Sequence, residues 1–353
     1  MDKNELLRRV QNAEPVIEQD FSEMDLEDTN LTGTVFDHCI FDGAHMARAQ
    51  LDYSQFVHCS FQRTDINEGR LTSVLFSETR FERALMTNAH LDNVTFFKCE
   101  IDGLALNNAT LDFVNFTNSR IDKLLLKAAR LEKVTLAECE TAMIDFSATT
   151  LERCVLLACD LRQCKFADTG FSTVVLVGSN LENLSFAGQD FVNTQFIDAK
   201  LSGCDFSQAR LPQANFQGAC LAGARFEKAH APNAIFMEAD LTGVCFDHAM
   251  LRQAIFISAR ASAAHFHAAD LYQSNWADAQ LPEAVLTDCD LTYADFSHAE
   301  LANTDLRGSQ MFRAKLHGVR DTGAQYTDRA RALETDPDQL ASESWRPVLP
   351  EKE

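Results

Sequence analysis

Large apolar residues recur at every fifth position of this chain, from Phe21 through Leu26 and Leu31 to Leu316. In most pentads a small residue stands two positions earlier, as Ala214 does before Phe216. A period of five fits neither an α-helix, at about 3.6 residues per turn, nor a long strand, at about two. Because one tight turn per pentad would keep every large residue inside, the pattern predicts a solenoid.

A second period of twenty predicts the cross-section of this solenoid. Phenylalanine recurs at that spacing from Phe146 to Phe266, and leucine recurs from Leu31 to Leu151. Like residues therefore stack when each coil has four sides of one pentad each. The run of about sixty pentads then makes about fifteen coils. Three large positions depart from the pattern, namely Thr141, Ala231 and Ala261.

The two ends of the chain differ from the repeats. Residues 1–20 are expected to hold a short capping helix, with Asp2 as N-cap, and a lead-in to residues 21–320, which form the repeat domain. Residues 321–353 are polar and charged, and predict a tail that is partly disordered or contains one short helix. Trp345 in this tail either anchors a partner or packs on the last coil.

Short motifs within the pentads resemble a known family. Ala239, Asp240 and Leu241 spell ADL, as do Ala269, Asp270 and Leu271, while ADF starts at Ala294. These motifs are similar to the A(D/N)LXX consensus of the pentapeptide-repeat family, and the resemblance covers residues 21 to about 318. It implies an all-β fold, a right-handed quadrilateral parallel β-helix. It implies no single function, because one fold can host several functions.

The composition limits the classes of partner. The 353 residues carry a net charge of −21, which argues against direct nucleic-acid binding and leaves protein partners. No run of apolar residues is long enough to span a membrane, and the first residues lack the apolar core of a signal peptide. We therefore expect a cytoplasmic protein without a membrane association, with signal-independent export left open.

Candidate chemistry along the chain is sparse. Cys154, Cys159 and Cys164 occupy the small inward position that alanine takes elsewhere, which favours core packing over metal binding. His38 and His58 are expected to stack in adjacent coils, but the sequence shows no carboxylate or thiol completing a metal set around them. No phosphate-binding loop and no catalytic triad motif occurs. We expect no enzyme activity, no catalytic residue, no metal ligand and no cofactor.

One wall of the predicted solenoid carries apolar residues where water-facing side chains are expected. Residues twenty apart lie in adjacent coils, so these side chains form a contiguous stripe that predicts a protein-binding or self-association surface. The alternatives are that β-propensity alone places them there, or that the tail covers them. The stripe comprises Val155, Leu157, Val175, Val177, Ile197, Ile235, Met237, Ile255 and Ile257.

Three functions follow as expectations. The first is a non-enzymatic adaptor that binds a protein, or a second copy of itself, along the stripe; the opening residues resemble pentapeptide proteins of bacterial type VI secretion, which implies a secretion or effector partner. The second is an acidic DNA mimic that regulates gyrase, as in the quinolone-resistance members of the family. Arg63, Arg80, Arg83 and Arg120 interrupt the acidic residues and argue against it. The third is an exported effector.

Overall fold

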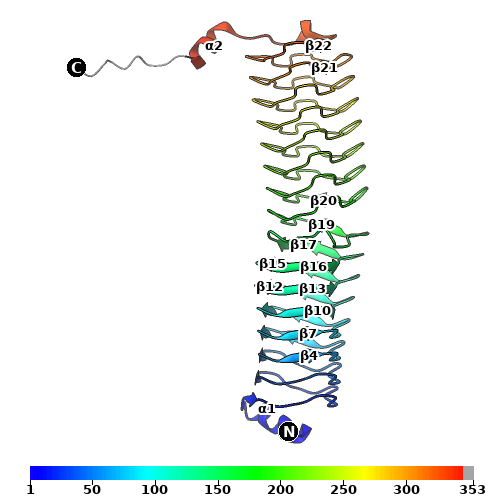
Figure 1. Cartoon of the computed structure of the whole chain (residues 1–353), viewed down its shortest axis with the longest axis vertical. Coiled ribbons are helices and arrows are strands. Elements are labelled where there is room, and N and C mark those ends of the chain that lie inside the picture. The colour runs from blue at the N-terminus through cyan, green and yellow to red at the C-terminus, as the bar shows by residue number, and fades with distance from the viewer. Residues whose placement is uncertain (345–353) are drawn as a thin grey trace, which may run out of the picture. The chain divides into compact units, whose positions relative to one another are not determined.

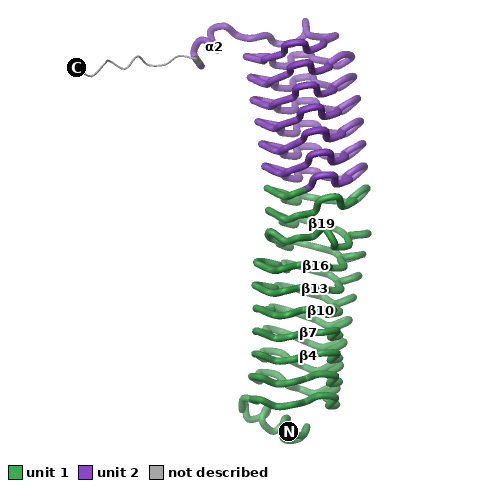
Figure 2. The backbone as a smooth tube through the Cα atoms, in the orientation of Figure 1, with its two compact units in different colours: residues 1–200 green, residues 201–353 purple. Residues whose placement is uncertain are grey.

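The computed structural model describes residues 1–344, and the chain divides into two compact units, residues 1–200 and 201–353 (Figure 2). Unit 1 is an all-parallel β-solenoid in which each strand pairs with the strand twenty residues away, as Phe36 pairs with Phe56. Strands β4, β7, β10 and β13 lie one above the next in Figure 1. The predicted parallel β-solenoid fold is confirmed.

Sheets of short strands form the walls of unit 1. One wall is an eight-stranded sheet: β1 (Val16–Ile17), β2 (Val35–Asp37), β3 (Gln55–Val57), β6 (Leu75–Ser77), β9 (Thr95–Phe97), β12 (Asn115–Thr117), β15 (Thr135–Ala137) and β18 (Val155–Leu156). The next wall along the chain has five strands: β4 (Ser60–Gln62), β7 (Arg80–Glu82), β10 (Glu100–Ala105), β13 (Arg120–Leu125) and β16 (Glu140–Asp145).

The remaining walls complete the four-sided coil. One is marked by isolated parallel bridges such as Asp65 with Leu85, and the longer strands β10, β13 and β16 run into it. The other is a seven-stranded sheet: β5 (Arg70–Thr72), β8 (His90–Asp92), β11 (Thr110–Asp112), β14 (Arg130–Glu132), β17 (Thr150–Glu152), β19 (Gly170–Ser172) and β20 (Phe191–Val192).

Unit 2 repeats the same coil with fewer regular strands. Isolated parallel bridges again join residues twenty apart, for example Ile235 with Ile255. The described part of this unit also holds strands β21 (Asp305–Leu306) and β22 (Gln325–Tyr326), a 3-10 helix (Arg329–Arg331) and helix α2 (Pro337–Ser344). Pairing between β21 and β22 carries the ladder to Tyr326.

The core of each unit is the predicted ladder of large residues. In unit 2 the Phe236 ring stacks on Phe216 and on Phe256, with 5.0 Å between ring centroids in both cases. In unit 1 the Phe36 and Phe56 rings stack in the same way, also at 5.0 Å. All these side chains are fully buried, and so are most of the small residues two positions before them, such as Ala214 and Ala234.

Tight turns at the corners explain the period of five. The residue two positions after each large residue usually has a positive φ, as His38 does at 53° and Ala158 at 52°. Its N–H donates to a carbonyl of the next coil; Ala158 N, for instance, lies 2.9 Å from the Val177 carbonyl oxygen. The chain therefore turns sharply once per pentad without leaving these backbone donors unpaired.

Helix α1 (Lys3–Gln11) covers the start of unit 1. The Asp2 carboxylate accepts a hydrogen bond from Glu5 N at 2.9 Å, so the predicted N-cap is present. Leu6 is fully buried, and a cleft beside the helix is lined by Leu7 and Val10 together with Thr29 of the first coil. Over the described residues, no helix is both long and apolar enough to cross a membrane.

Candidate functional site

The first half of the predicted stripe lies on the wall of β18 in unit 1. Val155 and Val175 form a parallel bridge, and both outward side chains are partly exposed. Leu157 is 38% exposed, and Val177 and Ile197 are partly exposed. We call Val155, Leu157, Val175, Val177 and Ile197 the unit 1 patch.

The backbone turns leave the centre of the unit 1 patch free of charged side chains. Its corner positions are Ala158 and Gly178, both with positive φ and neither with a long side chain. The two coils between Val155 and Gly178 therefore present only aliphatic side chains and backbone on this wall. A surface with this composition loses little hydration free energy when a partner covers it.

The second half of the stripe lies in unit 2 and is described separately. Ile235 and Ile255 form a parallel bridge, and the N–H of Glu238 donates to the Ile257 carbonyl at 2.9 Å. The side chains of Ile235, Met237, Ile255 and Ile257 are partly exposed, and we call them the unit 2 patch. Glu238 is exposed at its corner, so this patch carries a charge that the centre of the unit 1 patch lacks.

Trp345, the predicted tail anchor, lies outside the described residues. In the described part of the tail, Glu343 of helix α2 approaches two histidines. Its Oε2 lies 3.2 Å from His298 Nε2 and 3.0 Å from the Nε2 of the buried His317. Hydrogen bonding to His317 lowers the pKa of Glu343, which keeps the carboxylate charged in this contact.

The inward cysteines are placed as the sequence predicted. Cys154, Cys159 and Cys164 are free and buried. Burial raises the pKa of Cys154 to about 11 and the pKa values of Cys159 and Cys164 to about 12. A thiol with so high a pKa stays protonated at neutral pH and is a poor nucleophile and metal ligand. These residues therefore serve as small core side chains.

Several acidic residues of unit 1 are paired with arginines. The pairs span two positions along one strand or turn, so each carboxylate has a cation beside it on the same wall. They include Arg80 with Glu82 at 2.9 Å, Arg120 with Asp122 at 3.1 Å, and Arg162 with Asp160 at 2.7 Å. The wall consequently lacks the continuous negative charge of a nucleic-acid backbone.

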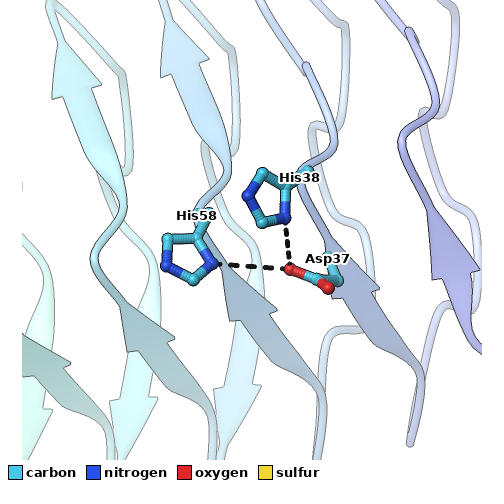
Figure 3. A group of neighbouring side chains, drawn as sticks. All are labelled: Asp37, His38 and His58. Atoms are coloured by element: carbon cyan, nitrogen blue, oxygen red, sulfur yellow. Dashed lines mark hydrogen bonds and ion pairs between the residues drawn. The ribbon is translucent and has the colours of Figure 1, made fainter.

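The sequence analysis missed one carboxylate beside the histidine pair. His38 and His58 stack as predicted, with ring centroids 4.4 Å apart. Asp37 lies beside both rings: its Oδ1 is 2.7 Å from His38 Nδ1 and 3.5 Å from His58 Nδ1 (Figure 3). The hydrogen bond from His38 lowers the pKa of Asp37. The signal was available, because Asp37 directly precedes His38 and belongs to the strand that pairs with the one before His58.

Comparison of the chain with protein-family models found a match to one family. A family model described as pentapeptide repeats matches in eight copies, over residues 29–67, 75–112, 190–227, 219–256, 264–299 and 289–320. These matches together span more than half of the chain. The search of curated proteins gave no match.

Solved structures with similar folds include members of this family and other β-helices. QnrB1, a plasmid-mediated fluoroquinolone resistance protein, is 14% identical over 51% of this chain and 89% of its own, with a TM-score of 0.36. HetL of Nostoc sp. strain PCC 7120, a pentapeptide-repeat protein involved in heterocyst differentiation regulation, is 20% identical over 96% and 98%, with a TM-score of 0.24. The A-module of the mannuronan C-5 epimerase AlgE6 of Azotobacter vinelandii is 8% identical over 96% of each chain, with a TM-score of 0.22. Likeness at this level carries no argument about the function of this chain.

Proposed function

Because the chain belongs to the pentapeptide-repeat family, we propose that it is a non-enzymatic scaffold that binds a protein partner through the unit 1 patch. The observation that carries this proposal is one wall of two adjacent coils, residues 155–158 and 175–178, which presents aliphatic side chains outward and no charge. An exposed apolar surface on a repeat protein is a common place for a partner to bind.

A rigid backbone supports this role. Val155 N donates to the Val134 carbonyl at 2.8 Å, and Val175 N donates to the Cys154 carbonyl at 2.9 Å. Since the wall is held by backbone hydrogen bonds to its neighbours, its backbone loses little conformational entropy when a partner binds. The unit 2 patch would supply a second contact of the same chemistry.

The partner is proposed to be a secretion or effector component, or a second copy of the chain. The first rests on the resemblance of the opening residues to pentapeptide proteins of type VI secretion. The second rests on the apolar patch alone, because such a surface can pair with itself. Export of the chain as an effector is a further expectation, which only a secretion assay tests.

A DNA mimic that regulates gyrase is the second candidate. The net charge of −21 favours it, because a negatively charged protein can occupy a basic DNA-binding surface. The arginine pairs on the acidic wall weigh against it, since they interrupt the negative charge along that surface. We therefore rank the aliphatic patch above the acidic wall.

Affinity capture from the source cells tests the proposal. Leu157→Asp places a charge in the unit 1 patch, and Val192→Asp is the matched control, because Val192 is also 38% exposed but lies on another wall of unit 1. We expect the wild type and Val192→Asp to retain a common partner that Leu157→Asp loses, with all three melting at similar temperatures. A partner retained equally by all three proteins would contradict the proposal, and if it were gyrase it would support the DNA mimic.

A further inference from the structure

The group formed by Asp37, His38 and His58 has the donor atoms of a metal site. One nitrogen of each histidine and one carboxylate oxygen of Asp37 lie within 4.8 Å of one another, and the three residues come from two adjacent coils (Figure 3). The three side chains are between 38% and 56% exposed, so an ion can reach them from solvent. Two imidazole nitrogens and one carboxylate oxygen suit zinc and other divalent transition metals.

The backbone holds the two histidines in this arrangement. Both occupy corner positions, with φ of 53° and 52°. His38 N donates to the Val57 carbonyl and His58 N donates to the Ser77 carbonyl, each at 3.0 Å. Since the corner geometry repeats from coil to coil, the rings are placed in register before any ligand binds, which lowers the entropic cost of binding.

The distances fit a small cation. Two ligands bound to a tetrahedral ion at about 2.0–2.1 Å lie about 3.3 Å from each other. The distances to Asp37 Oδ1, 2.7 Å from His38 Nδ1 and 3.5 Å from His58 Nδ1, lie on either side of this value. The shorter one is a hydrogen bond that His38 Nδ1 donates, so an ion would replace that proton, and the neutral ring would then carry its proton on Nε2. Small rotations of the exposed side chains are therefore enough to accommodate an ion.

The other side of the His58 ring supplies an independent argument. His58 Nε2 lies 3.3 Å from Glu78 Oε2, and a neutral ring carries its proton on the nitrogen that faces this carboxylate. In that tautomer Nδ1 presents its lone pair toward Asp37 Oδ1, 3.5 Å away, and a cation between the two atoms would be bound by both. A carboxylate behind a histidine ligand is also the usual outer contact of zinc sites.

We propose that Asp37, His38 and His58 form a surface binding site for a divalent transition-metal ion of the zinc type, with Glu78 orienting His58 and the remaining coordination position open to solvent. The site is independent of the proposed protein-binding patch. It lies on the first coils of unit 1, and its ligands come from the corner after β2, the end of β2 itself and the corner after β3.

The second histidine group of the described residues has a different chemistry. Asp336 N donates to His317 Nδ1 at 3.3 Å, so the proton of the neutral ring lies on Nε2, which faces Glu343 at 3.0 Å. Nε2 is then a hydrogen-bond donor and offers no lone pair to a metal. This group is a hydrogen-bonded contact of helix α2, and it gives a second control for the experiment.

Calorimetric titration of the tag-free, full-length protein with Zn²⁺ under reducing conditions tests the proposal. We expect the wild type to bind an ion that is lost in His58→Gln, and Glu78→Gln to weaken the affinity by about tenfold or more. His90→Gln and His298→Gln are the matched controls and should bind as the wild type does. Titration with Co²⁺ adds a spectroscopic readout, since its visible absorption reports nitrogen and oxygen ligands at the same site.

Two results would overturn the site. One is a wild type that binds no ion, and the other is His58→Gln and His38→Gln binding Zn²⁺ as the wild type does. Each variant changes an exposed side chain, so far-ultraviolet circular dichroism is expected to show an unchanged fold. Loss of binding is then a loss of ligands rather than of structure.

Discussion

At the scale of single residues, the inward position two residues before each large residue is usually occupied by a small side chain. Alanine, cysteine, serine, threonine and valine all occur there, and Ser54 and Cys59 are both buried. Many of the hydroxyl and thiol groups are paired with backbone carbonyls, as Ser54 Oγ donates to Leu31 O at 2.8 Å, whereas the hydroxyls of Thr34 and Thr194 have no hydrogen-bond partner among the described residues. Small polar residues are therefore tolerated inside the solenoid because the coil supplies acceptors for them.

The positions of the large inward residues tolerate substitution less well. Phe236→Ala removes a fully buried ring that stacks on Phe216 and Phe256, and we expect the free energy of unfolding to fall by roughly 3–5 kcal/mol. Phe113→Ala is the control, because Phe113 is 47% exposed at a corner. Among the ring contacts of the described residues, its ring contacts only the Lys133 ammonium. Urea denaturation measures both. Equal costs for the two variants would contradict the inward assignment of the ladder.

The buried thiols predict a loss of stability at alkaline pH. Their pKa values rise from 9.0 to about 11 in Cys154 and about 12 in Cys159 and Cys164, so the folded state keeps them protonated while the unfolded state ionises. A group whose pKa is higher in the folded state than in the unfolded state contributes its full stabilisation below the unfolded pKa. This stabilisation is lost as the pH rises through the folded pKa. We expect the melting temperature to fall between about pH 9 and pH 12.

The triple variant Cys154→Ala, Cys159→Ala, Cys164→Ala separates the thiols from other groups that titrate in this range. Alanine fills the same small position elsewhere in the ladder, so the variant should fold, and its melting temperature should fall less steeply with pH than that of the wild type. An identical pH profile in both proteins would show that the thiols contribute nothing to the alkaline transition.

At the scale of elements, the walls are built from strands too short to be stable alone. Most have two or three residues, and their stability comes from pairing in register with the strands twenty residues before and after. The longer strands β10, β13 and β16 run across one corner, and Lys123 and Met143 there do not have positive φ. The sequence carries a sign of this change, because Leu104, Leu124 and Ile144 take the inward position that small residues usually occupy.

Helix α1 closes the exposed edge of the first coil. Deleting residues 1–15 would uncover the coil that Leu6 packs against and the unpaired edge of β1, so we expect self-association of the deletion variant. Light scattering at increasing protein concentration measures this. Arg8→Ala, which removes only exposed ion pairs with Glu5 and Glu14, is the control and should keep the size of the wild type. A deletion variant of unchanged size would contradict a capping role.

At the scale of the whole molecule, a high net charge coexists with a local apolar surface. The net charge of −21 is distributed with interleaved arginines, as in the pair of Arg80 and Glu82. The wall of Val155 and Val175 carries aliphatic residues outward instead. Because the four walls of a coil point in different directions, the same repeat can remain highly charged overall and still offer an uncharged surface to a protein partner.

The sequence by itself determined the fold, because a period of five with large residues such as Phe216 and Phe236 has one packing solution, a coil with four sides. It also located the apolar stripe, since residues twenty apart, such as Ile235 and Ile255, must then be neighbours.

The tertiary structure alone decided what side chains do at the corners. A left-handed turn directs the His38 and His58 rings along the edge and brings Asp37 beside both, which residue spacing cannot reveal because side-chain direction at a corner depends on the local φ. The tertiary structure also decided which acidic residues pair with arginines. The net charge gives only the balance of charges, whereas the fold sets the distances between them.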